Sequence, residues 1–348
     1  MRSIQNLTIA NKKNWNEMLF ISLLFFIPFF ICVLRPLQSM DTMGYYNYFL
    51  QANLKNPHPE KTFVYLSLFW RKLFGDVVGF RGVIFTYTLI AYGILIEILK
   101  KCKHPFLSFI IYFSFAYMYQ LCIQMRSSVS NLIFLLALFD IRDRKLLQYY
   151  FKMFIAFLIH NSAVFFVIVY PIAIYVLKHK KMLKWLPLFA IIGSFVAASS
   201  IALIVNKTEG LNIYIFRTLW TYYSASKIGQ SGIHPINSIS LSIFCFYYYF
   251  VYKVKIKNIS DFECISLVAI ALSLMNYALG YILIPIFAER YTVALNLVLI
   301  IFLPLFMEHF KEKKIFLVLL LIYLYIINRQ YQTLNFTISY LLGDAPSY

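Results

Sequence analysis

The chain has 348 residues, of which 61% are hydrophobic and only 13% are charged, and its formal net charge is +18. Soluble domains carry roughly 25% charged residues, so this composition predicts an all-α, polytopic integral membrane protein and excludes disordered, collagen-like and disulfide-scaffold chains. The basic excess lies in short runs between apolar segments, as the positive-inside rule expects. No nucleic-acid motif is present, so we expect no nucleic-acid partner.

The first apolar run covers residues 18–34 and follows Arg2, Lys12 and Lys13. It ends at Arg35-Pro36 without the small-x-small pattern of a cleavage site. We therefore expect an uncleaved first span with the N-terminus in the cytoplasm.

Later apolar runs are separated by basic clusters, and together they predict about 10–11 membrane segments in one integral membrane domain, 1–348. Two longer polar stretches, 35–76 and 206–237, are expected as large loops on the outer face. Within the first of these, the apolar piece 63–74 is too short to span and carries Arg71, which favours an interfacial or re-entrant helix.

The run 147–177 has a basic cluster at each end, yet it is shorter than the roughly 40 residues that two spans need. Two short helices hinged near His160-Asn161 would leave both clusters in the cytoplasm. One long helix with a cluster outside is the alternative.

Charged residues in or beside membrane segments are functional candidates because their insertion is costly. Arg126 would either snorkel to lipid headgroups or contact an anion through its planar fork of donors. His160 would be a buried neutral histidine, a general base or a donor to a leaving phosphate. Asp41 would cap a helix or turn, or would orient or deprotonate a sugar hydroxyl.

Further candidates are expected to bind substrate. Tyr45 offers an aromatic face near Asp41 for a sugar ring or for the membrane interface. Glu289-Arg290 would neutralise each other, or Arg290 would bind a pyrophosphate, as would Arg217 in the loop 206–237. No Walker A, HExxH, GxSxG or DxD sequence is present, so no metal site and no cofactor are expected.

Short motifs in a fixed order resemble the EpsG-like branch of Wzy-type polysaccharide polymerases. An Asp-x-x-x-Tyr stretch follows the first span, an acidic residue starts the next helix, and an arginine opens a later span. A His-x-Ser-Ala motif and an Arg-Tyr pair follow. These are Asp41 to Tyr45, Glu60-Lys61-Thr62-Phe63, Arg126, Ile159-His160-Asn161-Ser162-Ala163 and Arg290-Tyr291.

The resemblance implies a GT-C-like membrane glycosyltransferase of the bacterial cytoplasmic (inner) membrane. Such a protein joins polyprenyl-pyrophosphate-linked oligosaccharide repeat units on the outer face, among membrane lipids, with a chain-length regulator and a flippase as candidate partners. Arg126 would be catalytic, and either Asp41 or His160 would be the general base. The resemblance does not decide between these two residues. Substrate binding would fall to Arg290, Arg217, Tyr45, Glu60 and Glu289. A flippase and an O-antigen ligase are the rival functions.

Overall fold

The computed structural model describes residues 2–35, 40–54, 60–117, 121–122, 124–207, 235–254, 256–274 and 294–309, and this part of the chain is helical. It forms two compact units, 1–167 with 300–348 and 168–299. The elements of the first unit are α1 (Arg2–Val33), α2 (Met40–Gln51), α3 (Lys61–Lys101), α4 (Pro105–Phe115), α5 (Met125–Arg142), α6 (Leu146–Ile159), the 3-10 helix η2 (Asn161–Ile168), α14 (Leu299–Phe306) and η5 (Met307–His309). Those of the second are α7 (Val169–Lys178), η3 (Lys180–Lys184), α8 (Leu186–Lys207), α10 (Pro235–Lys253), η4 (Ile256–Asn258) and α11 (Asp261–Ser273).

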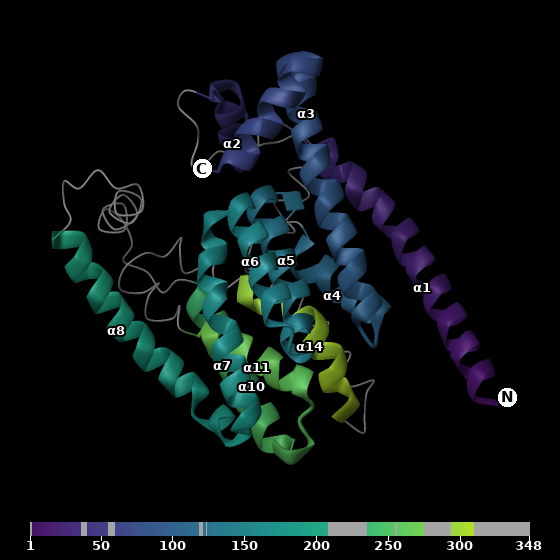
Figure 1. Ribbon diagram of the computed structural model, residues 1–348, viewed down its shortest axis with the longest axis vertical. Coiled ribbons are helices and arrows are strands. Elements are labelled where there is room, and N and C mark those ends of the chain that lie inside the picture. The colour runs from purple at the N-terminus through teal and green to yellow at the C-terminus, as the bar shows by residue number, and fades with distance from the viewer. Residues whose placement is uncertain are drawn as a thin grey trace. The chain divides into compact units, whose positions relative to one another are not determined.

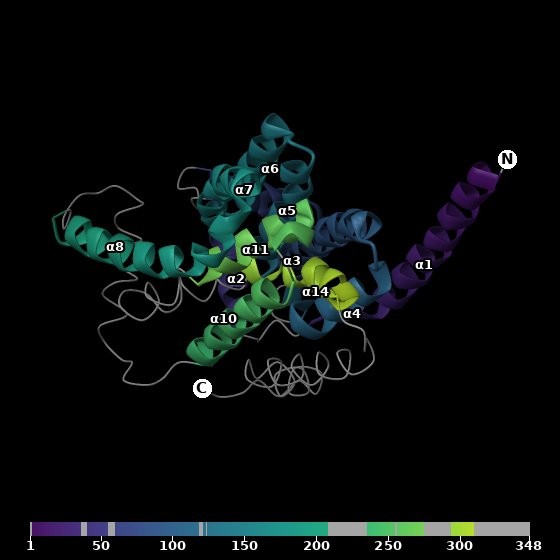
Figure 2. The same cartoon turned by 90° about the horizontal axis from the view of Figure 1, so that it is seen from below.

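Helix α5 is the centre of the first unit and lies between α3 and α6 (Figures 1 and 2). It is buried along almost its whole length, including the polar side chains Ser128, Ser130 and Asn131. At its C-terminal end the buried Asp140 pairs with Lys152 of α6. Burial on all sides is typical of a central helix surrounded by other helices.

Helix α3 is broken at Gly75, whose φ of 72° lies in the left-handed region that glycine adopts without strain. The segment before the break folds back along the segment after it. Trp70 lies against Gly82 and donates its indole N–H to Thr86 Oγ1 at 3.0 Å. The apolar piece 63–74 is therefore helical, as expected, whereas its interfacial position stays a prediction.

Arg71 has a structural role that the sequence did not indicate. Its guanidinium donates to the carbonyls of Phe49, Leu50 and Ala52, at 3.3, 2.8 and 2.9 Å. These are carbonyls at the C-terminal end of α2, which lack partners within the helix. Arg71 thus fastens α2 to the first segment of α3.

The break predicted at His160-Asn161 is present. His160 is extended (φ −151°, ψ 121°) between α6 and η2. The hydroxyl of Tyr149, near the start of α6, donates to the carbonyl of Phe166 at 2.5 Å, so the chain reverses after α6. This reversal favours two short helices over one long one for 147–177.

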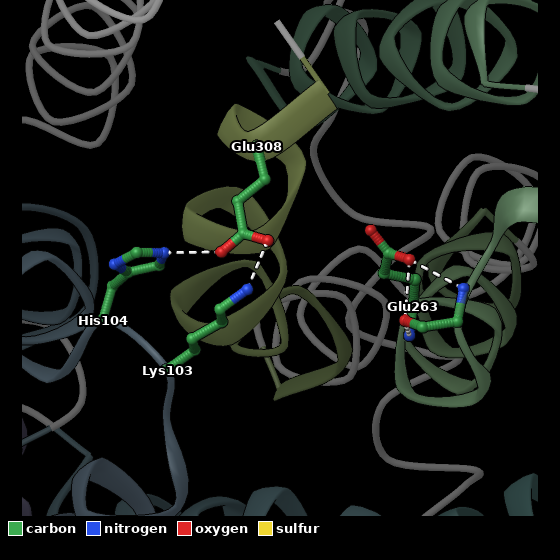
Figure 3. Close-up of polar contacts among 5 residues, drawn as sticks. Lys103, His104, Glu263 and Glu308 are labelled. Carbon is green, nitrogen blue, oxygen red and sulfur yellow. Dashed lines mark hydrogen bonds and ion pairs between the residues drawn. The ribbon is translucent and has the colours of Figure 1, made fainter. Parts of the chain in front are cut away.

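The basic turns of the first unit gather at one end. Lys101 lies over the ring of Phe139, 5.8 Å from its centroid, so the α3–α4 turn lies beside the C-terminal end of α5. Lys103 and His104 of the same turn contact Glu308 of η5, as Figure 3 shows, at 2.7 and 2.8 Å. Because α5 is about 27 Å long, its N-terminal end lies far from these turns.

The second unit is built around α11, whose residues after Asp261 are buried. Ser260 and Glu263 form a reciprocal cap at its start, with the Glu263 carboxylate shown in Figure 3. Lys180 donates to the carbonyl of Ile259 at 2.7 Å, and Tyr248 of α10 donates to that of Lys184 at 3.1 Å. The basic turns after α7 and α10 therefore lie side by side.

Two helical segments, Lys61–Lys101 and Asn161–Lys178, are long and apolar enough to cross a membrane. Five shorter apolar helices accompany them among the described residues. The helical class is thus confirmed, and these segments indicate a membrane protein. The number of spans, the orientation and the single domain 1–348 stay predictions, and most of the expected loop 206–237 lies outside the described residues.

Candidate functional site

Glu60 joins two of the other sequence-derived candidates. Its Oε2 forms an ion pair with Nη1 of Arg126, and its Oε1 lies 2.5 Å from Nδ1 of His160. The three side chains are 5%, 9% and 16% exposed, so the cluster is largely shielded from solvent. We call Glu60, Arg126 and His160 the charge cluster.

The contact to Glu60 assigns the tautomer of His160. Glu60 is ionised beside the arginine, and an ionised carboxylate only accepts hydrogen bonds. Nδ1 of His160 must therefore carry the hydrogen that faces Glu60. In the neutral ring, Nε2 is then the atom with a lone pair, which is the arrangement of a histidine oriented to accept a proton.

Two aromatic rings hold the guanidinium of Arg126. Its Cζ lies 4.8 Å from the ring centroid of Tyr45 and 5.0 Å from that of Phe63. Cation–π contacts of this kind are stronger when water is excluded. The rings therefore fix the position of a cation that is also paired to Glu60.

The charge cluster lies where the ends of three helices meet. Glu60 directly precedes α3 and its carbonyl accepts from the N–H of Phe63 at 3.1 Å. Arg126 lies in the first turn of α5, where the positive end of the helix dipole favours an anion nearby. His160 ends α6, and Thr62 ties the two chain segments by donating to the carbonyl of Leu158 at 2.8 Å.

The other predicted site residues fall into two groups. Asp41 and Tyr45 lie in α2, one turn apart, and Tyr45 reaches the charge cluster through Arg126. Arg217, Glu289 and Arg290 lie outside the described residues. The structure thus unites Tyr45, Glu60, Arg126 and His160.

Thr62 and Phe63 were not predicted as site residues. Both follow Glu60 in the stretch that carries the resemblance, so the signal was present in that motif. Phe63 belongs by sequence to the apolar piece 63–74, and a phenylalanine beside a cation cannot be told from a core phenylalanine by sequence alone.

Two further arginines near the C-terminal end of α1 bind backbone carbonyls. Arg81 of α3 donates to the carbonyls of Val33, at 3.0 Å, and of Arg35. Arg35 in turn donates to the carbonyl of Leu121 at 3.0 Å. These contacts tie the end of α1 to α3 and to the chain leading into α5, which is a structural role.

These features define an all-helical protein with apolar helices of membrane-spanning length and a buried Glu–Arg–His cluster at one end of its first unit. A family model described as the EpsG family matches residues 18–341. The chain therefore belongs to the EpsG family, which is linked to exopolysaccharide biosynthesis, and the resemblance is confirmed. A search of curated proteins and a search of solved structures each gave no match.

Proposed function

We propose that the protein is a membrane polymerase of lipid-linked oligosaccharide repeat units, acting on the outer face of the bacterial cytoplasmic membrane. The observation that carries the proposal is the charge cluster, in which a buried carboxylate contacts both an arginine and a histidine. Such a set provides a proton acceptor and a cation for a leaving anion in one shielded place.

The face of the membrane is inferred from the basic turns. The charge cluster lies at the N-terminal end of α5, and Lys101, Lys103 and Arg142 lie at the other end. If those turns are cytoplasmic, as basic loops usually are, the cluster faces outward, where the repeat units are joined.

In the proposed reaction, His160 Nε2 takes the proton of an acceptor sugar hydroxyl. The hydroxyl oxygen forms a bond to the anomeric carbon of the donor glycan. The bond between that carbon and the phosphate oxygen breaks, and polyprenyl diphosphate leaves with the electron pair. Arg126 stabilises the charge that develops on the diphosphate, with Arg217 and Arg290 as further candidate ligands. Asp41, Tyr45 and Glu289 are candidate contacts to the sugars.

An assay with purified protein and lipid-linked repeat units tests the proposal. Growth of a glycan ladder on the lipid supports it. Transfer of glycan to a different acceptor would identify a ligase, and movement of the lipid between leaflets without bond formation would identify a flippase. A chain-length regulator and a partner flippase are proposed to change ladder length and substrate supply.

A further inference from the structure

The guanidinium of Arg126 is engaged before any substrate arrives. Nη1 is paired with Glu60, and the rings of Tyr45 and Phe63 hold the group in place. A diphosphate and the Glu60 carboxylate are both anions that prefer the same planar fork of donors. They therefore compete for Arg126.

Glu60 also contacts His160 through its other oxygen, so its charge acts on two groups at once. A carboxylate paired with an arginine is partly neutralised and stabilises a neighbouring imidazolium less than an unpaired one does. Loss of the Arg126 contact would therefore make His160 a better proton acceptor.

Building on the polymerase function proposed above, we propose that Arg126 exchanges Glu60 for the diphosphate of the lipid-linked donor, and that this exchange activates His160. Glu60 is then a positioning residue that restrains the site while no donor is bound. The base becomes competent when the leaving group is in place, which limits loss of the donor to water.

Arg126 has a further N–H donor with which it can bind the diphosphate. Its Nε is buried and makes no hydrogen bond within the described part of the chain. A guanidinium offers five N–H donors, so Nε–H can donate to a phosphate oxygen while the aromatic rings keep the group in place. The contact to Glu60 has to loosen for the exchange to occur.

The exchange predicts an unusual result for Glu60→Gln. The amide keeps the shape of the side chain but does not compete as an anion, so a polyprenyl diphosphate should bind roughly three- to tenfold more tightly. Turnover should fall by at least about tenfold, because the amide cannot stabilise the imidazolium. The matched control is Glu97→Gln, which alters an exposed ion pair with Lys100 and should change neither quantity.

The experiment measures binding of polyprenyl diphosphate to detergent-solubilised protein together with kcat and KM for the lipid-linked donor. Weaker or unchanged binding in Glu60→Gln overturns the exchange, and weaker binding would instead mean that Glu60 holds Arg126 in position for the diphosphate. If the wild-type protein binds no polyprenyl diphosphate, the proposed function itself is wrong.

Removal of one partner of a buried ion pair can prevent folding, so a second comparison includes the double variant, which removes both charges of the pair. Arg126→Gln alone should bind the diphosphate more weakly, and Arg126→Gln with Glu60→Gln should bind it no more tightly than Arg126→Gln. If Glu60→Gln raises the affinity for the diphosphate even when Arg126 is replaced, Glu60 acts by general repulsion of the anion. That result would overturn the exchange.

Discussion

Nδ1 of His160 contacts Glu60, and in the proposed reaction Nε2 accepts the proton of the substrate hydroxyl. His160→Gln keeps a polar side chain of similar length but removes the proton acceptor. We expect glycan synthesis to fall about 10²- to 10⁴-fold, the usual contribution of a general base, with unchanged protein in the membrane. The measurement is ladder formation per amount of immunodetected protein.

The same measurement on Asp41→Asn is the comparison, because the sequence leaves both Asp41 and His160 as candidates for the general base. If Asp41→Asn abolishes synthesis while His160→Gln retains it, the base is Asp41 and the charge cluster has another role.

Arg126→Lys tests whether the arginine works as a fork or as a point charge. A lysine ammonium cannot reproduce paired donors, so we expect a loss of about 1.5–3 kcal/mol, or roughly ten- to a hundredfold in rate. Polymer length and amount at equal protein level are the readouts. Arg142→Lys, which alters an exposed pair with Asp143 far along the same helix, is the control and should be nearly silent.

At the residue scale the sequence identified the members of the charge cluster but not their mutual contacts. Glu60 and His160 are 100 positions apart, and nothing local shows which carboxylate an arginine will meet. The break at His160 was predicted, because basic clusters at both ends of a short apolar run favour a chain that reverses between them. Arg71 was not, since its bonds to α2 carbonyls depend on tertiary packing.

The fold-back of α3 is the element that places Glu60. A Cβ added at Gly82 would lie 2.3 Å from Cδ2 of Trp70, a distance no real contact shows, so Gly82→Ala must displace the indole. We expect a destabilisation of about 1–3 kcal/mol, the usual effect of overpacking, with a lower midpoint of thermal unfolding and reduced synthesis.

Gly93→Ala is the matched control on the same helix, because nothing lies within 4 Å of a Cβ at that position. Alanine there should leave the unfolding midpoint unchanged or raise it, since glycine inside a helix costs about 0.5–1 kcal/mol. Equal behaviour of the two variants would mean that the Trp70 contact does not hold the fold-back.

At the scale of the whole molecule, the basic turns predict the side of the membrane on which each end lies. Lys145→Cys and Lys181→Cys, both exposed positions, should react with an impermeant thiol reagent only after the membrane is opened. Leu54→Cys, also exposed, should react in intact cells. The exposed Cys245 is replaced by serine in all three.

Labelling of Lys181→Cys from outside would contradict the reversal at His160 as a membrane hairpin. It would also place the two basic turns of the second unit on the outer face, because Lys180 contacts Ile259. The helical class was predicted from composition and is confirmed, whereas the orientation inferred from the charges stays a prediction. The division into two units was not predicted, since all the apolar runs look alike in hydropathy and their packing partners are set by side-chain shape.

The distance along the chain between Glu60 and its partners bears on how the protein is made. A ribosome delivers Glu60 to the membrane long before Arg126, and His160 follows 100 residues after Glu60. Until then the carboxylate must stay near the aqueous boundary or in the insertion machinery, because an unpaired charge is costly in lipid. Nascent chains that stop before α5 should therefore be degraded quickly, whereas chains that include α5 can bury the first pair and persist. The charge cluster would in this way serve as a checkpoint of membrane insertion.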